Sequence, residues 1–390
     1  MTDASSPRDP GRRRWLRTGV SGAVAATLAP VAALAAQRAA TAAPAVPSAS
    51  TPTPTPATPL RLDLNESSYG PSPQVPAAVQ RALADAPRYV GAAKLQALQE
   101  QIARIEGVAP SQVVVGEILE ALGQHLAITG NGGSFVYSVP GYGALVDAAR
   151  PFGGHAVEVP LDAKLENDLP ALEAAIADDT RALFIVNPHN PSGTISAADV
   201  FDGFLRRASA RALVIVDEAY LDYQPDFERR TAVRHLREGR NVAVFRTLGK
   251  IHALAGLQLG YAVVPQALAD ALRARGVGGA HAQNQLSIAA AAASLADTGH
   301  IVRVRDQVAA ERALWLDTLK SLGLRHAQPA GNFVFFDAGR PHAEVAAALL
   351  ARGVKVARAF APYDRWVRIT IGVPAENVRA REAVVAVLGR

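Results

Sequence analysis

The sequence predicts an α/β fold, with a doubly wound, mostly parallel sheet in a large domain and a smaller α+β domain after it. After residue 60, short apolar runs alternate with segments of helical periodicity, which is the spacing of βαβ units. Three of the runs are expected to be buried strands: ALFIV at 182–186, ALVIV at 212–216 and NVAVF at 241–245. Because the carboxyl ends of parallel strands share one edge of the sheet, ligand-binding residues are expected just after these runs.

Capping residues mark two of the helices that are expected around these strands. Ser196 opens the segment SAADVFDGFLRRA, where it can cap the helix while Asp199 completes a capping box. Asp168 is likewise placed to cap a helix over DLPALEAAIA. The segment ALAGL, soon after Lys250, is too short for a crossover helix and is expected to shape a pocket instead.

The pattern changes in the last sixty or so residues, where a compact α+β unit is expected. The apolar runs in GNFVFFDA at 331–338 and WVRITIG at 366–372 are predicted strands. Between them the sequence predicts a helix near His342–Arg352 and a short strand at Val354–Val356. Two domains joined in this way usually close over a ligand that lies between them.

Composition excludes several functions. The chain has 390 residues and is 49% hydrophobic, so it can bury a large core and is expected to be globular. Its formal charge of +5 comes mostly from residues 1–43, where six arginines and two aspartates contribute +4. The nearly neutral remainder gives no support to nucleic-acid binding. Cysteine is absent and the nine histidines show no metal-binding spacing, so neither disulfides nor a metal site are expected.

The first 43 residues have the pattern of an export signal. Three arginines at 12–14 precede an Ala-rich apolar stretch from Val20 to Ala36. The pattern is similar to a twin-arginine signal, so we expect export to the periplasm by the twin-arginine machinery. A membrane anchor is the less favoured alternative, because seventeen residues rich in Ala and Gly are short for a span. The Pro/Thr-rich segment at 44–60 is expected to be an extended linker.

One lysine, one acid, one tyrosine and one asparagine follow the three predicted strands. They are Asn190 after the first strand, Asp217 and Tyr220 after the second, and Lys250 after the third. The set suits pyridoxal phosphate chemistry, in which an amine forms a Schiff base, an acid keeps the ring nitrogen protonated, and neutral donors tune the phenolic oxygen. Taken singly, each has an ordinary alternative, such as a solvated lysine, a helix-capping aspartate or a turn asparagine.

Four longer motifs surround these residues: NPHNPSG at 187–193, DEAY at 217–220, LAGLQLGY at 254–261 and VRITIG at 367–372. They resemble the motifs of the fold-type I aminotransferases, most closely those of the histidinol-phosphate aminotransferase branch. The resemblance runs from about Leu62 to the C-terminus. It implies a homodimer with pyridoxal 5'-phosphate as cofactor, which exchanges amino and keto groups between an amino acid or related amine and a 2-oxo acid.

The resemblance and the residues around its motifs give three groups of candidate site residues, of which Gln258 stands where relatives have arginine and Arg358 is a further cation whose alternative is an exposed side chain. They are Lys250, Asp217 and Tyr220 for catalysis; Asn190, Tyr142, Gly116, Gln258 and Tyr69 for the cofactor; and Arg368, Asn332 and Arg358 for the substrate. Tyr142 would stack on the cofactor ring, and Tyr69 would reach the cofactor phosphate of the neighbouring subunit. Arg368 would hold a carboxylate through two parallel hydrogen bonds.

The resemblance completes the expected division of the chain, because the segment 61–90 would join the small domain. In chain order, we expect a signal peptide at 1–43, a linker at 44–60, the joining segment at 61–90, a large cofactor-binding domain at 91–320 and a small domain at 321–390.

The sequence departs from the family where the cofactor phosphate would bind. Ile118 and Leu119 stand where relatives have Gly and Ser, Gly249 replaces a serine, and Gln258 replaces an arginine. A charged hydrogen bond contributes about 1.5 to 3 kcal/mol, so we expect weaker cofactor binding than in relatives. Backbone N–H groups at the helix that starts near Gly116 remain as phosphate donors.

Two other functions stay open at this stage. The same cofactor can support decarboxylation, elimination or oxidation, and Lys250 and Asp217 would serve all of these reactions. A non-catalytic exported binding protein of the same fold is the third possibility, because the phosphate end has lost polar groups.

Overall fold

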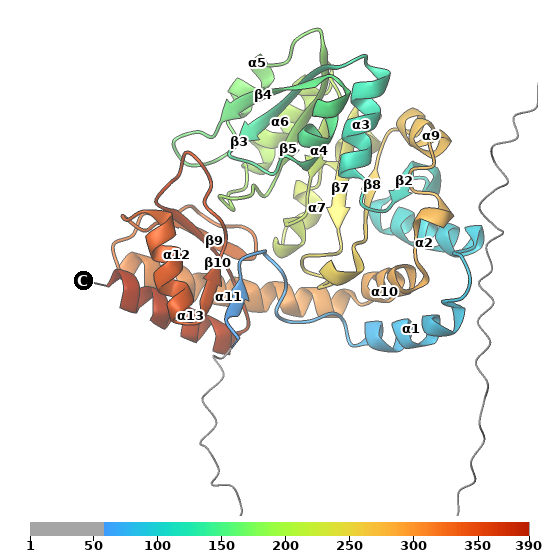
Figure 1. The fold of residues 1–390 in the computed structure, drawn as a ribbon. Coiled ribbons are helices and arrows are strands. Elements are labelled where there is room, and N and C mark those ends of the chain that lie inside the picture. The colour runs from blue at the N-terminus through green and yellow to red at the C-terminus, as the bar shows by residue number, and fades with distance from the viewer. Residues whose placement is uncertain (1–57, 390) are drawn as a thin grey trace, which may run out of the picture. The chain divides into compact units, whose positions relative to one another are not determined.

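The computed structural model describes residues 58–389, so the predicted signal and nearly all of the predicted linker lie outside the described residues. Two domains are seen in this part of the chain (Figure 1). Within it, no helix is long and apolar enough to cross a membrane.

The large domain is built on a seven-stranded sheet with the order β2-β8-β7-β6-β5-β3-β4. Its strands are β2 Val113–Val115, β3 Gly133–Val139, β4 Gly154–Pro160, β5 Thr180–Val186, β6 Val214–Asp217, β7 Val242–Thr247 and β8 Gly260–Val263. Strands β3 to β7 are parallel, whereas β8 is antiparallel to both of its neighbours. Strand β2 therefore runs in the same direction as β7, and its carboxyl end reaches the same edge of the sheet.

Helices cover both faces of this sheet (Figure 1). One face is covered by α3 Leu119–Thr129, α4 Ala144–Ala149 and α9 Gln266–Ala274, and the other by α5 Leu169–Ala174, α6 Ala198–Ala208 and α8 Val233–Arg237. Successive strand residues alternate between the two cores, as Phe184 and Ile185 do in β5. The predicted doubly wound α/β fold is confirmed.

A third group of helices packs beside the β2 and β8 edge. It consists of α1 Gln74–Ala82, α2 Ala92–Glu106 and α10 Gln285–Ala296, and the short α7 Phe227–Arg230 lies apart from it. The predicted pocket-shaping segment after Lys250 becomes a single 3₁₀ turn, Ala255–Leu257.

One of the two predicted helix caps is confirmed and the other is wrong. Asp168 accepts a hydrogen bond from the backbone N–H of Ala171 at 3.0 Å. In α6, however, the N-cap residue is Ala197, and the hydroxyl of Ser196 is buried without a partner. Asp199 pairs with Arg229 at 2.9 Å instead of reaching back to the N-cap. This exposed ion pair with a residue thirty positions away is not visible in the local pattern.

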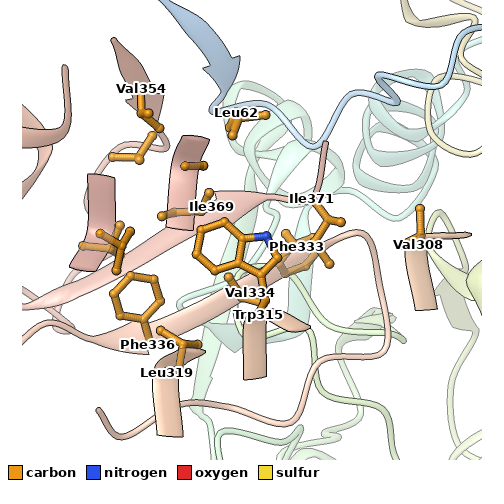
Figure 2. Close-up of a cluster of buried hydrophobic side chains, with 14 of the residues drawn as sticks. Leu62, Val308, Trp315, Leu319, Phe333, Val334, Phe336, Val354, Ile369 and Ile371 are labelled. Atoms are coloured by element: carbon orange, nitrogen blue, oxygen red, sulfur yellow. The ribbon is translucent and has the colours of Figure 1, made fainter. Parts of the chain in front are cut away.

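The small domain combines two two-stranded sheets with three helices. Its elements are β1 Leu60–Leu62 paired in parallel with β10 Val354–Val356, β9 Phe333–Asp337 paired antiparallel with β11 Trp366–Thr370, α11 Thr298–Ser321, α12 His342–Ala351 and α13 Pro374–Leu388. Trp315 lies in the middle of its core, fully buried, beside Phe333 and Ile369 (Figure 2). The indole N–H of Trp315 donates to Asn377 Oδ1 at 3.1 Å.

The core contacts correct both limits of the predicted small domain. Val308, Trp315 and Leu319 of α11 lie in the core of the small domain. Helix α11 therefore belongs to the small domain, although the sequence analysis assigned the residues before 321 to the large domain. The segment 61–90 is divided, because β1 pairs with β10 whereas α1 packs against α10 beside the large domain (Figure 1). Helical periodicity shows that a helix has a buried face, but not which core buries it.

Trp315 should dominate the stability of the small domain. Trp315→Ala removes the largest fully buried side chain among the described residues and one of the two hydrogen bonds that Asn377 Oδ1 accepts, so we expect a loss of about 3 to 5 kcal/mol. Urea unfolding followed by circular dichroism measures this. The neighbouring Leu314→Ala, at a side chain that is 47% exposed, is the matched control and should cost less than about 1 kcal/mol. Equal losses in the two variants would contradict the proposed core.

Candidate active site

A cavity of about 800 Å³ lies at the carboxyl edge of the large sheet and is also lined by the small domain. Seven of the residues predicted from the sequence line it: Lys250, Asp217, Tyr220, Asn190, Tyr142, Arg358 and Arg368. Large-domain residues reach it from the ends of β2, β3, β5, β6 and β7, which all point to this edge. The convergence follows from strand direction, as the sequence suggested.

Asp217 is the most deeply buried acid of the cavity. It ends β6, is 3% exposed, and its Oδ1 accepts a hydrogen bond from the backbone N–H of Ala219 at 2.9 Å. Burial raises the pKa of Asp217 from 3.8 to about 7, although the Ala219 hydrogen bond and the nearby Lys250 both lower it. A carboxyl group in this position binds either a proton or a cationic partner.

Lys250 and Tyr220 face each other across the cavity floor. Lys250 Nζ lies 5.8 Å from the centre of the Tyr220 ring and donates a hydrogen bond to the carbonyl oxygen of Leu64 at 3.3 Å. Tyr220 is buried against Phe333, and its hydroxyl accepts a hydrogen bond from Asn65 Nδ2 at 3.1 Å. The primary amine is therefore held close to a phenol whose position depends on Asn65.

Tyr142 and Asn190 lie on the large-domain wall. Tyr142 follows β3 and is 44% exposed, so one aromatic surface is open to a ligand. Its pKa is raised to about 12, mainly by burial and next by Asp217, so the hydroxyl stays neutral. Asn190 follows β5, and its Oδ1 accepts a hydrogen bond from Arg368.

Arg368 connects the two domains at the cavity. It lies in β11, is 7% exposed, and donates to Asn190 Oδ1 and to the carbonyl oxygen of Asp63, the latter at 2.8 Å. Its guanidinium carbon lies 5.0 Å from the centre of the Phe360 ring, and that of Arg358 lies 4.6 Å from the same ring. Burial and then Arg358 lower the pKa of Arg368, but a guanidinium stays charged at neutral pH.

An apolar wall faces these polar groups from the small domain. Leu350 of α12 is 48% exposed and Leu64 is 53% exposed, and both line the cavity. Ala346, Val356 and Phe360 complete the wall. Large side chains that stay exposed side by side in a cavity favour an apolar ligand group.

Four predicted residues do not line the cavity. Gln258 is exposed at the end of a 3₁₀ turn and has a left-handed backbone conformation. Gly116 precedes the lining residue Glu117 but does not line the cavity itself, and the side-chain amide of Gln283 lies beside it. Asn332 is 1% exposed and donates hydrogen bonds to the carbonyl groups of Asn65 and Glu66.

The fourth, Tyr69, packs on the small-domain core of its own chain, and its hydroxyl is buried without a partner. Its contact with a neighbouring subunit stays a prediction. The amide nitrogen of Asn332 holds the loop that carries Asn65, and its Oδ1 is buried without a partner, so its expected contact with substrate stays a prediction.

A family model for class I and II aminotransferases matches residues 57–384. The chain belongs to this family. It is 34% identical over 335 residues to a histidinol-phosphate aminotransferase of Moorella thermoacetica, which covers 84% of this chain and 86% of the relative. It is 37% identical over 322 residues to an aromatic amino acid aminotransferase of Rhodococcus jostii, with 82% and 87% covered. The crystal structure of a Sinorhizobium meliloti histidinol-phosphate aminotransferase in complex with pyridoxal-5'-phosphate matches with a TM-score of 0.72 at 27% identity, over 85% of this chain and 91% of that one.

Asn65, Glu117 and Glu120 are among the cavity residues of this class I and II aminotransferase that sequence reasoning missed. The two glutamates stand in the segment VVVGEILEAL, on either side of Ile118 and Leu119. Sequence reasoning considered the hydrogen-bond donors that these two apolar residues replace, but not the acids beside them. Asn65 stands in RLDLNESSYG, and its backbone φ of 56° is a conformation that asparagine tolerates better than most residues. That preference was the available signal for Asn65.

The raised pKa of Asp217 predicts a pH-dependent stability. Between about pH 4 and pH 7, the folded protein keeps a proton on Asp217 that the unfolded chain releases at its ordinary pKa of 3.8. This group should therefore make stability fall as the pH rises, with a slope approaching about 1.4 kcal/mol per pH unit. Asp217→Asn should remove that component in urea unfolding of the unliganded protein across this range.

The exposed Glu228→Gln is the matched control and should keep the wild-type slope. If Asp217→Asn also keeps the wild-type slope, the carboxyl group of Asp217 is not held protonated by burial.

Proposed function

We propose that this protein is a pyridoxal-phosphate-dependent aminotransferase, which exchanges amino and keto groups between an amino acid or related amine and a 2-oxo acid. The observation that carries the proposal is that Lys250, Asp217 and Arg368 line one cavity, beside Tyr220. Membership of the aminotransferase family supports it, and so does the cofactor bound in the S. meliloti relative.

The inner part of the cavity fits the pyridine ring and the aldehyde of this cofactor. Asp217 is a buried carboxyl group, and a pyridinium N–H would offset the cost of charging it. Tyr142 offers an aromatic face for the ring. Tyr220 and Asn190 carry neutral groups for the phenolic oxygen, and Lys250 supplies the primary amine.

The chain's own residues divide the work of the reaction. When bound, the cofactor supplies an aldehyde that condenses with an amine and a ring that withdraws electrons from the substrate's α carbon. Lys250 Nζ, once it is a free amine, takes the proton from that carbon. Asp217 would keep the ring nitrogen protonated, and the Tyr220 hydroxyl, held by Asn65, would be available to the phenolic oxygen.

Arg368 orients the substrate. A guanidinium group can bind a carboxylate through two parallel hydrogen bonds. Its present contact with Asn190 Oδ1 occupies one donor, and a substrate carboxylate would exchange with that contact. Fixing the carboxylate also fixes which bond of the α carbon lies perpendicular to the ring.

The apolar wall favours donors with an apolar side chain. Burying a large side chain against Leu64, Leu350 and Phe360 would contribute about 1.5 to 3 kcal/mol. The R. jostii relative, named for aromatic amino acids, supports this choice. A screen of amino donors tests it, and faster turnover of phosphate esters or acidic amino acids than of aromatic ones would contradict it.

Lys250→Ala should abolish transamination, because no other amine replaces the condensing group and the base at once. Borohydride reduction of the cofactor-loaded wild-type protein should fix a pyridoxyl group on the peptide that contains Lys250, as detected by mass spectrometry. The peptide that contains Lys355, a cavity lysine paired with Asp63 at 2.8 Å, serves as the internal control and should stay unlabelled. Transamination by Lys250→Ala at the wild-type rate would refute the proposal.

The proposal includes a homodimer, in which Tyr69 reaches the neighbouring subunit. Support comes from the sequence position of Tyr69 in NESSYGPS, and the half-buried ring would have to turn outward from its own core. Sedimentation equilibrium at micromolar concentration should give twice the chain mass, and a monomer would contradict this part.

We also propose export by the twin-arginine route, on the basis of Arg12 and Arg13 and the apolar stretch after them. These residues lie outside the described part of the chain. Replacing both arginines by lysine should keep the protein in the cytoplasm of a bacterium with a twin-arginine system, as measured by cell fractionation. Periplasmic accumulation of that variant at the wild-type level would exclude the route.

A further inference from the structure

The junction between β2 and α3 turns two carboxylates toward the cavity. Ile118 and Leu119 are 2% and 3% exposed, because their side chains pack into the core. Glu117 and Glu120, on either side of them, are exposed and line the cavity. Among the described residues, no hydrogen bond or ion pair engages either carboxylate. An unpaired acid stays charged here only because water reaches it.

Glu117 is close enough to the site to interact with its charges. Burial and then Glu120 raise its pKa, and Lys250 lowers it. Glu117 acts in turn on Asp217 and on Tyr142. The titratable groups that face it are therefore Glu120 in the first turn of α3 and Tyr142, Asp217 and Lys250 from the neighbouring strand ends.

The same junction carries the groups that would receive an anion. The first turn of α3, an eleven-residue helix, directs backbone N–H groups toward its N-terminus, where anions are usually stabilised. Thr247 adds a hydroxyl, which accepts a hydrogen bond from Gly249 N–H at 3.1 Å. Glu117 and Glu120 put negative charge at this position, and Lys250 is the lining cation that lowers the pKa of Glu117.

A phosphate monoester carries about −1.5 to −2 charges at neutral pH. Two like charges a few ångströms apart repel each other more strongly in a partly buried site than in bulk water. A ligand phosphate at the start of α3 therefore meets favourable backbone dipoles and unfavourable carboxylates at the same time.

We infer that Glu117 determines how strongly this protein prefers phosphorylated over unphosphorylated cofactor. The charged carboxylate of Glu117 weakens binding of the cofactor phosphate. Protonation of this carboxylate at lower pH removes that repulsion. The inference rests on the proposed function, because it assigns the phosphate to the start of α3.

Calorimetric titration of the unliganded protein with pyridoxamine 5'-phosphate and with pyridoxamine tests this. Neither ligand has an aldehyde, so covalent capture by Lys250 does not contribute, and the two differ only in the phosphate. We expect Glu117→Gln to tighten binding of the phosphorylated ligand roughly tenfold at about pH 8 and to leave pyridoxamine unchanged. The difference between variant and wild type should shrink as the pH falls, because protonation of Glu117, whose pKa is raised, and of the ligand phosphate both reduce the repulsion.

Glu382→Gln, at an exposed position of α13, is the matched control for the loss of one negative charge and should bind both ligands as the wild type does. Glu120→Gln shows whether the second carboxylate acts in the same direction. An unchanged preference in Glu117→Gln, with both ligands still bound, overturns the inference but leaves the proposed function standing. Binding of neither ligand by the wild type overturns both.

Discussion

The groups that line the cavity also make the hydrogen bonds that join the two domains there. The bonds run from Asn65 to Tyr220, from Lys250 to Leu64 and from Arg368 to Asn190. In each pair, one partner is placed by a strand end of the large sheet and the other by β11 or by the segment after β1. A change in the relative position of the two domains therefore also changes the geometry of the site. A substrate that displaces Asn190 from Arg368 changes the contact that holds the domains.

Asn65 transmits this constraint to the phenol of Tyr220. Its backbone is left-handed, its N–H donates to Thr370 Oγ1 at 2.9 Å, and its carbonyl accepts from Asn332. Each hydrogen bond contributes about 0.5 to 1.5 kcal/mol, which together offset a backbone conformation that is unfavourable for most residues. Contacts with the small domain therefore fix the position of the Asn65 side-chain amide that donates to Tyr220. Asn332 holds this loop through hydrogen bonds to the carbonyl groups of Asn65 and Glu66.

The sequence predicted the parts of the site that follow directly from strand direction. Asp217 and Lys250 stand just beyond buried apolar runs, and a parallel sheet brings such positions together whatever the loops do. Asn65 could not be found in this way, because its contact with Tyr220 joins residues 155 positions apart. Glu117 was missed for a different reason. Strand β2 was not among the three strands predicted for the large domain, and its direction follows from the antiparallel pairings of β8 with β2 and β7, which no local pattern encodes. The domain of α11 likewise depends on which core receives Trp315.

Water access separates the acids of the cavity into two kinds that make opposite demands on a ligand. Asp217 is out of reach of solvent, so its charged form needs a cationic partner, and burial strengthens that interaction. Glu117 and Glu120 keep partial access to water, so their charged forms need no partner and weaken any anion placed beside them. A ligand with a cationic ring and an anionic arm gains most of its binding free energy at the Asp217 end. The affinity for such a ligand then depends on contacts with its ring, on Lys250 and on the domain contacts around them. The start of α3, where backbone dipoles and carboxylates oppose each other, contributes less.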